Sequence, residues 1–91
     1  MASRVPSAYH QGMAEITYLE ATQSPPERGD WILLEQDPDG LFKTRSQRIK
    51  GNVTHLTSHA DRWPLEQAIE KALIDAANNN IATIFVMRQA G

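Results

Sequence analysis

The sequence predicts a small α+β domain: an antiparallel β-meander of three to four strands, one amphipathic helix packed on one face, and a C-terminal strand that rejoins the sheet (β-β-β-β-α-β). Three observations predict this class. Apolar residues recur at helical spacing along residues 65–76, a strong turn pattern at residues 37–40 separates two strand-like segments, and residues 81–87 form a continuous apolar run. With 91 residues, of which 41% are hydrophobic and 22% charged, the chain has the length and composition of one globular domain.

The N-terminal part predicts an arm, a strand and a loop. Residues 1–12 have no hydrophobic period, so we expect a flexible arm that precedes a single domain at residues 13–91. Residues 13–20 alternate roughly and include β-branched and aromatic side chains, which predicts a first strand. Residues 21–29 contain two consecutive prolines and predict an exposed loop, because proline cannot donate to a β-ladder.

The middle of the chain predicts the meander. Residues 30–36 are typical of a second strand, and residues 41–49 of a strand that returns antiparallel to it. Residues 37–40 between them read Asp-Pro-Asp-Gly, in which proline presets φ for a type I turn and glycine accepts the left-handed conformation that closes a hairpin. A second turn at residues 50–52 leads into a shorter strand at residues 53–57.

A helix is predicted after a break in the alternation at residues 58–61. Pro64 fits its first turn, where the missing N–H has no cost, and Ser58 and Asp61 are the alternative N-caps. The apolar residues of this segment follow the i, i+4, i+7, i+8, i+11 spacing of one buried face. They are Leu65, Ile69, Ala72, Leu73 and Ala76.

Polar residues occupy the other face of this helix, where Lys71 and Asp75 are spaced for a weak ion pair. Three asparagines at residues 78–80 predict the end of the helix, because Asn tolerates the left-handed C-cap better than any residue except Gly. The last strand, residues 81–87, follows after a short return, so we expect it to lie against the preceding helix.

The last strand is apolar on both faces, as strands are when both sides of a sheet are covered. One helix covers only one side. We therefore expect a second copy of the chain to cover the other side as a homodimer, most simply with two-fold symmetry. The alternative is that the arm at residues 1–12 folds over the open face. The residues expected at the dimer interface are Trp31, Leu33, Phe42, Phe85 and Met87.

A basic segment is the first candidate binding site. No acidic residue occurs between Gly40 and Ala60, and guanidinium and ammonium groups on a sheet can bind phosphate or carboxylate. By strand alternation two of the cations share a face and a third lies on the opposite face. The alternative is a solvated edge strand whose cations prevent aggregation, and four cations are few for nucleic acid. The four residues are Lys43, Arg45, Arg48 and Lys50.

A metal site is the second candidate, formed by His55, His59 and Asp61. However, a spacing of four residues brings two histidines together only on a helix, and here we expect a strand end and a loop. Polar loop histidines are therefore the preferred interpretation, and no cofactor is expected. The absence of cysteine excludes thiolate chemistry and cysteine zinc sites, and the glycines match no nucleotide-binding motif.

These observations predict a small non-catalytic, homo-oligomeric binding or adaptor module. Polyanion binding through the basic segment, nucleic acid included, is one alternative. An enzyme or small-molecule binder with its pocket between protomers is another. The net charge of −2 draws the chain to neither nucleic acid nor anionic lipid, and no segment reaches the length of a membrane span. The opening residues lack the apolar run of a signal peptide, so we expect a cytoplasmic location and no membrane partner.

Overall fold

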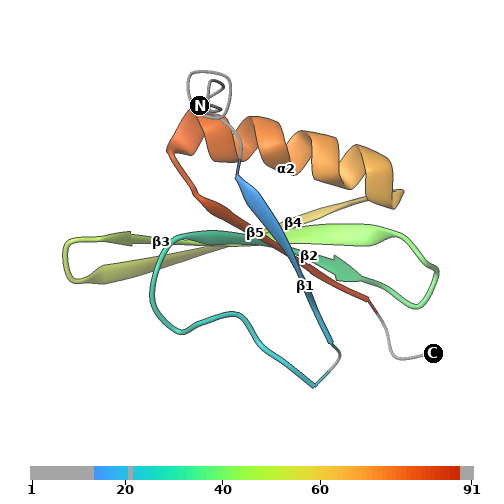
Figure 1. The fold of residues 1–91 in the computed structure, drawn as a ribbon, viewed down its shortest axis with the longest axis horizontal. Coiled ribbons are helices and arrows are strands. Elements are labelled where there is room, and N and C mark those ends of the chain that lie inside the picture. Colours follow the sequence, from blue (N-terminus) through green and yellow to red (C-terminus); the bar gives the residue numbers. More distant parts are fainter. Residues whose placement is uncertain (1–13, 21, 89–91) are drawn as a thin grey trace, which may run out of the picture.

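A computed structural model of the protein describes residues 14–20 and 22–88 (Figure 1). The order of elements confirms the predicted α+β class, with one helix on one face of a sheet and a C-terminal strand that rejoins it. The arm predicted at residues 1–12 lies outside the described residues. The elements are β1 (Glu15–Leu19), β2 (Trp31–Gln36), β3 (Phe42–Lys50), β4 (Val53–Trp63), α2 (Leu65–Asn79) and β5 (Thr83–Met87).

The described strands form one five-stranded sheet in the order β1-β5-β2-β3-β4. The predicted meander is present as β2, β3 and β4, which pair antiparallel. The sheet is mixed, however, because β5 lies between β1 and β2 and runs parallel to both. Two strands that run in the same direction need a connection that returns along one face of the sheet. The helix α2 makes one such return, to β5, and the loop between β1 and β2 makes another on the opposite face (Figure 1).

The helix α2 packs on one face of the sheet, which we call the helix face. Its buried residues are Ala68, Ala72 and Ala76, whose small side chains let the helix lie close to the strands. They belong to the same buried cluster as Leu34, which is fully buried. The rest of the buried cluster is apolar: Ile32, Phe42, Ile81, Ile84 and Val86.

The predicted buried face of the helix is largely confirmed. Ala72 and Ala76 are buried, and Leu65, Ile69 and Leu73 are partly buried and pack against the core. Ala68, four residues before Ala72, belongs to the same face and was not predicted. Among the described residues no helix is long and apolar enough to span a lipid bilayer.

On the opposite face of the sheet, the loop face, the part around Trp31, Leu33 and Gln47 is covered by the chain itself. Trp31 and Leu33 point to this face and are only 5% and 2% exposed. The Trp31 Nε1–H donates to the carbonyl of Pro26 at 2.9 Å. The amide of the buried Gln47 donates to the carbonyls of Glu27 at 3.0 Å and Gly29 at 2.9 Å. These hydrogen bonds hold the loop between β1 and β2 against this part of the sheet. The loop therefore takes the place that the sequence assigns to a second copy or to the arm.

The fourth strand is longer than predicted. β4 has eleven residues, and residues 58–61 belong to it instead of forming a break. Its pairing with β3 continues to the partners Phe42 and Trp63, after a register shift between Lys43 and Arg45. The predicted caps, Ser58 and Asp61, are therefore wrong, because both lie within a strand that runs almost directly into the helix.

The two ends of α2 differ in how well they were predicted. The N-cap is Pro64, which makes no side-chain capping bond. The C-cap is Asn80 with φ 57°, in the left-handed conformation that the three asparagines predict. The predicted ion pair between Lys71 and Asp75 does not form, because the Lys71 ammonium lies over the Trp63 ring instead, 4.3 Å from its centroid.

Candidate functional site

The basic segment does not form one cationic patch in the structure. Lys43 and Arg45 lie on the loop face, whereas Arg48 lies on the helix face, as alternation predicts. Lys50 is exposed at the end of β3.

Three of the four cations have acidic partners from β2 and the residues next to it. Lys43 Nζ lies 3.6 Å from the Asp37 carboxylate, and Arg45 Nη1 lies 3.4 Å from that of Glu35. Arg48 Nε lies 3.3 Å from the carboxylate of Asp30. Such partly exposed pairs contribute little to stability, about 0–1 kcal/mol each. Their consequence is electrostatic, because they neutralise the charges on which polyanion binding depends.

The three residues of the candidate metal site do not converge. His55, His59 and Asp61 are exposed and are spread along the extended strand β4. At about 3.3 Å per residue, two histidines four positions apart are separated by about 13 Å. Within residues 14–20 and 22–88, no group of three His, Cys, Asp or Glu side chains could hold a metal ion.

The predicted interface residues are mostly interior. Trp31 and Leu33 are buried on the loop face, and Phe42 is buried in the helix-face core. Phe85 is partly buried and makes a T-shaped contact with Trp31, with ring centroids 6.4 Å apart and an interplanar angle of 73°. Met87 is also partly buried on the same face. Trp31, Leu33 and Phe42 are already buried within a single chain, so they are not available for contact with a second copy.

The exposed edge of the sheet is a different surface, which sequence reasoning did not identify. β4 is the last strand on its side of the sheet, and its residues are exposed from Val53 through Arg62. Residues 53–60 carry no Asp, Glu, Lys, Arg or Pro. Two large apolar side chains on this strand, Val53 and Leu56, are 55% and 68% exposed. Residues 53–58 pair with β3 in unbroken register, so this part of the edge is regular.

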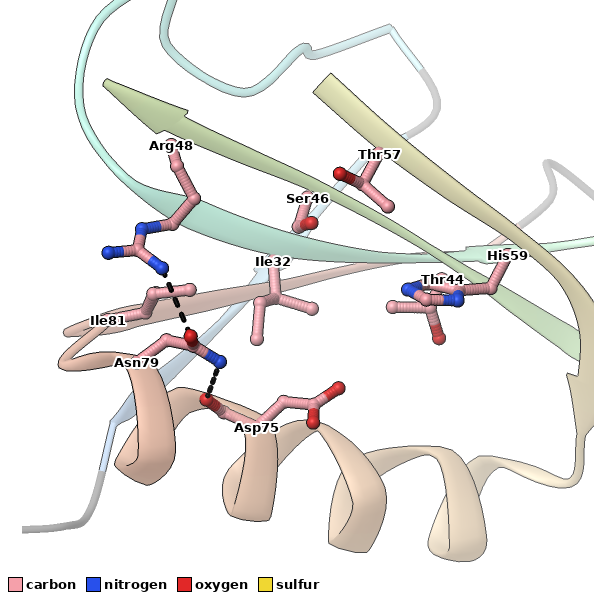
Figure 2. Close-up of a pocket in the computed structure, with 9 residues that line it drawn as sticks. All are labelled: Ile32, Thr44, Ser46, Arg48, Thr57, His59, Asp75, Asn79 and Ile81. Atoms are coloured by element: carbon pink, nitrogen blue, oxygen red, sulfur yellow. Dashed lines mark hydrogen bonds between the residues drawn. The ribbon is translucent and has the colours of Figure 1, made fainter. Parts of the chain in front are cut away.

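A polar hollow lies between α2 and the strands β2, β3 and β4 (Figure 2). Its volume is about 300 Å³, and Ile32 and Ile81 give it an apolar base. Polar groups from both layers line the rest: Thr44, Ser46, Arg48, Thr57, His59, Asp75 and Asn79. Arg48 Nη1 donates to the Asn79 side-chain oxygen at 3.2 Å, and the Asn79 amide donates to the Asp75 carbonyl at 2.9 Å.

A smaller hollow of about 150 Å³ adjoins the first and shares Thr44, His59 and Asp75 with it. It adds Asp61, Trp63 and Lys71 to the lining. We call the two hollows together the helix–sheet groove. In the sequence this groove is indicated only by polar residues at alternate positions of β3, which lie on the helix face. Lys71 and Asp75, one turn apart on α2, are the matching polar residues of the helix.

Comparison with known proteins gives no match to this chain among protein families, curated proteins or solved structures. The proposals below therefore rest on the residues and their geometry.

Proposed function

We propose that the protein is a non-catalytic binding module that pairs with a second copy of itself along β4. The observation that carries this proposal is the exposed edge of the sheet at β4, whose regular part, residues 53–58, carries no Asp, Glu, Lys or Arg. An edge strand presents unpaired backbone N–H and C=O groups, and proteins usually protect such edges with lysine, proline, a bulge or a very short strand. β4 has eleven residues, and its regular part, residues 53–58, has none of these protections.

A second copy is the occupant that this edge suits best. Two identical strands can pair antiparallel around a two-fold axis, so that each satisfies the backbone of the other. Because residues 53–60 carry no charged side chain except histidine, self-pairing there opposes no fixed like charges. The other edge, β1, is a poorer candidate, since it has only five residues and begins with Glu15.

This proposal keeps the homodimer predicted from sequence but moves its interface. The proposed contact residues are now the exposed Val53 and Leu56, because Trp31 and Leu33 are buried within the chain. Polyanion binding is not favoured, because three of the four cations in the basic segment are paired with carboxylates.

Replacing Leu56 with lysine tests the proposal. Leu56 is 68% exposed, so Leu56→Lys should leave the fold intact while placing an ammonium at the centre of the paired edge. We expect the parent protein to sediment as a dimer at micromolar to submillimolar concentration, and the variant to dissociate about tenfold more readily, equivalent to about 1.4 kcal/mol.

A matched control is Ile74→Lys, which makes the same kind of change at a 58% exposed position on α2, away from β4. This control should dimerise as the parent does. A parent that stays monomeric throughout the concentration range would contradict the proposal, as would equal dissociation constants for the parent and Leu56→Lys.

A further inference from the structure

The helix–sheet groove departs from the apolar pattern expected between a helix and a sheet. On β3 the helix-face residues after Phe42 are Thr44, Ser46 and Arg48, where apolar side chains would extend the core. On α2 the residues that line the groove are polar as well: Lys71, Asp75 and Asn79, at i, i+4 and i+8. The polar residues of β3 thus face the polar residues of α2 across the groove. Departures of this kind from local folding rules are expected at functional sites.

We infer that the groove binds a small hydroxylated amine, such as an amino sugar or amino alcohol, with its ammonium group at Asp75. The first argument is charge. The Arg48 guanidinium is already engaged by Asp30 and Asn79. Within the described part of the chain, the Asp75 carboxylate has neither an ion pair nor a side-chain hydrogen bond, so the free charge in the larger hollow is negative.

The fold adds to this negative potential. Asp75 and Asn79 lie in the last turns of α2, where backbone carbonyls without helical partners carry partial negative charge. Asp61, in the adjoining hollow, is a second carboxylate with no ion pair among the described residues. A cationic ligand is therefore favoured over an anionic one.

The adjoining hollow already holds an ammonium group. Lys71 Nζ lies 4.3 Å from the centroid of the Trp63 ring, and the aromatic face stabilises that cation. Both residues line this hollow together with Asp75. The lining therefore already binds one alkylammonium group, that of Lys71, through the Trp63 ring. Because Lys71 makes no ion pair with Asp75, the Asp75 carboxylate can bind the ammonium group of a ligand.

The rest of the lining fits the hydroxyl groups of the ligand. Thr44, Ser46 and Thr57 present hydroxyls that act as both donors and acceptors. Ile32 and Ile81 offer an apolar base for the carbon skeleton, as sugar-sized ligands require. The volume of about 300 Å³ lies at the lower end of the range for small-molecule pockets, roughly 300–1,000 Å³, which suits a monosaccharide.

Three sugars with the same pyranose ring and different charge test this inference: glucosamine, glucose and glucuronate. Each is titrated into the isotope-labelled protein, and backbone amide shifts are followed by NMR. We expect glucosamine to shift the amides of the groove residues, led by Asp75 and His59. Glucose should bind more weakly, and glucuronate most weakly of the three.

Removal of the charge at Asp75 provides the second arm. Asp75→Asn should weaken glucosamine binding about tenfold, because a charge-assisted hydrogen bond contributes at least about 1.5 kcal/mol, and it should barely change glucose binding. Glu70→Gln is the matched control, since Glu70 is an exposed carboxylate of α2 that lines neither hollow. Its affinity for glucosamine should equal that of the parent.

Three results would overturn the inference: no shift of groove amides with any of the sugars, glucuronate binding as tightly as glucosamine, or equal glucosamine affinity in Asp75→Asn and Glu70→Gln. The first two use the unmodified protein, so they do not depend on how well a variant folds. Sedimentation of the same samples shows separately whether the β4 dimer forms, because neither hollow includes Val53 or Leu56.

Discussion

Replacing Trp31 with alanine is expected to lower the free energy of unfolding by about 3–5 kcal/mol, the usual cost of removing a large buried aromatic side chain. Trp31 is only 5% exposed. Its indole N–H donates to the loop carbonyl of Pro26 at 2.9 Å, and its ring makes a T-shaped contact with Phe85. The substitution therefore opens a cavity and also releases one of the bonds that fasten the loop over the sheet.

Urea denaturation followed by circular dichroism measures this effect. Trp31→Phe is the informative companion, because it keeps a buried aromatic ring of smaller size and removes the donor to Pro26. It should lose about 1–2 kcal/mol, combining a lost hydrogen bond with a small loss of volume. A loss below about 1 kcal/mol for Trp31→Ala would mean that the loop does not cover this face in solution. If a second copy covered Trp31 instead, the loss would depend on protein concentration.

Replacing Leu34 with alanine is expected to lower the free energy of unfolding by about 2–5 kcal/mol. Leu34 is 0% exposed and belongs to the cluster that joins the sheet to the alanines of α2. Because the helix meets the sheet through small side chains, it cannot move far enough to fill the space that is left. For a domain whose total stability is about 5–15 kcal/mol, this loss is a large fraction.

The control for this prediction is Ile74→Ala, which removes a similar apolar group from the 58% exposed side of α2. Chemical denaturation of this variant should give a midpoint close to that of the parent, with a change within about 0.5 kcal/mol. Equal losses for the two variants would contradict the packing of α2 on the sheet described above.

The elements with a regular pattern were predictable from sequence. The helix follows from its apolar spacing, its end from the asparagines before Ile81, and the hairpin from the turn at residues 37–40. Gly40 in that turn has φ 90°, which glycine adopts without strain. In each case the signal lies within a few neighbouring residues, so no knowledge of the rest of the chain is needed.

The elements that depend on distant partners were not predictable. The C-terminal half of β4 is exposed except for the partly buried Trp63, so it shows no apolar alternation, and its pairing with β3 makes it a strand. The parallel position of β5 between β1 and β2 is a long-range property. The loop at residues 22–29 is largely exposed, as its prolines predict, but the hydrogen bond from Trp31 to the Pro26 carbonyl has no signal in the side-chain pattern.

The candidate sites show the same limit. The basic segment was recognised from charges counted along one strand, but its carboxylate partners Asp30, Glu35 and Asp37 come from a neighbouring strand and its ends. The groove joins β3 to Asp75, about thirty positions further along the chain, and no spacing rule connects them. Sequence alone identified the polar residues but not which of them meet.

The pairing of β4 with a second copy is tested most directly by backbone amide hydrogen exchange at low and high protein concentration. We predict that amides within residues 53–58 whose N–H groups point away from β3 become protected as concentration rises. Amides at the ends of the other edge strand, β1, which open locally, should keep the same protection at both concentrations. If exchange along β4 stays fast at the highest concentration, the edge is unpaired and the protein does not associate through this strand.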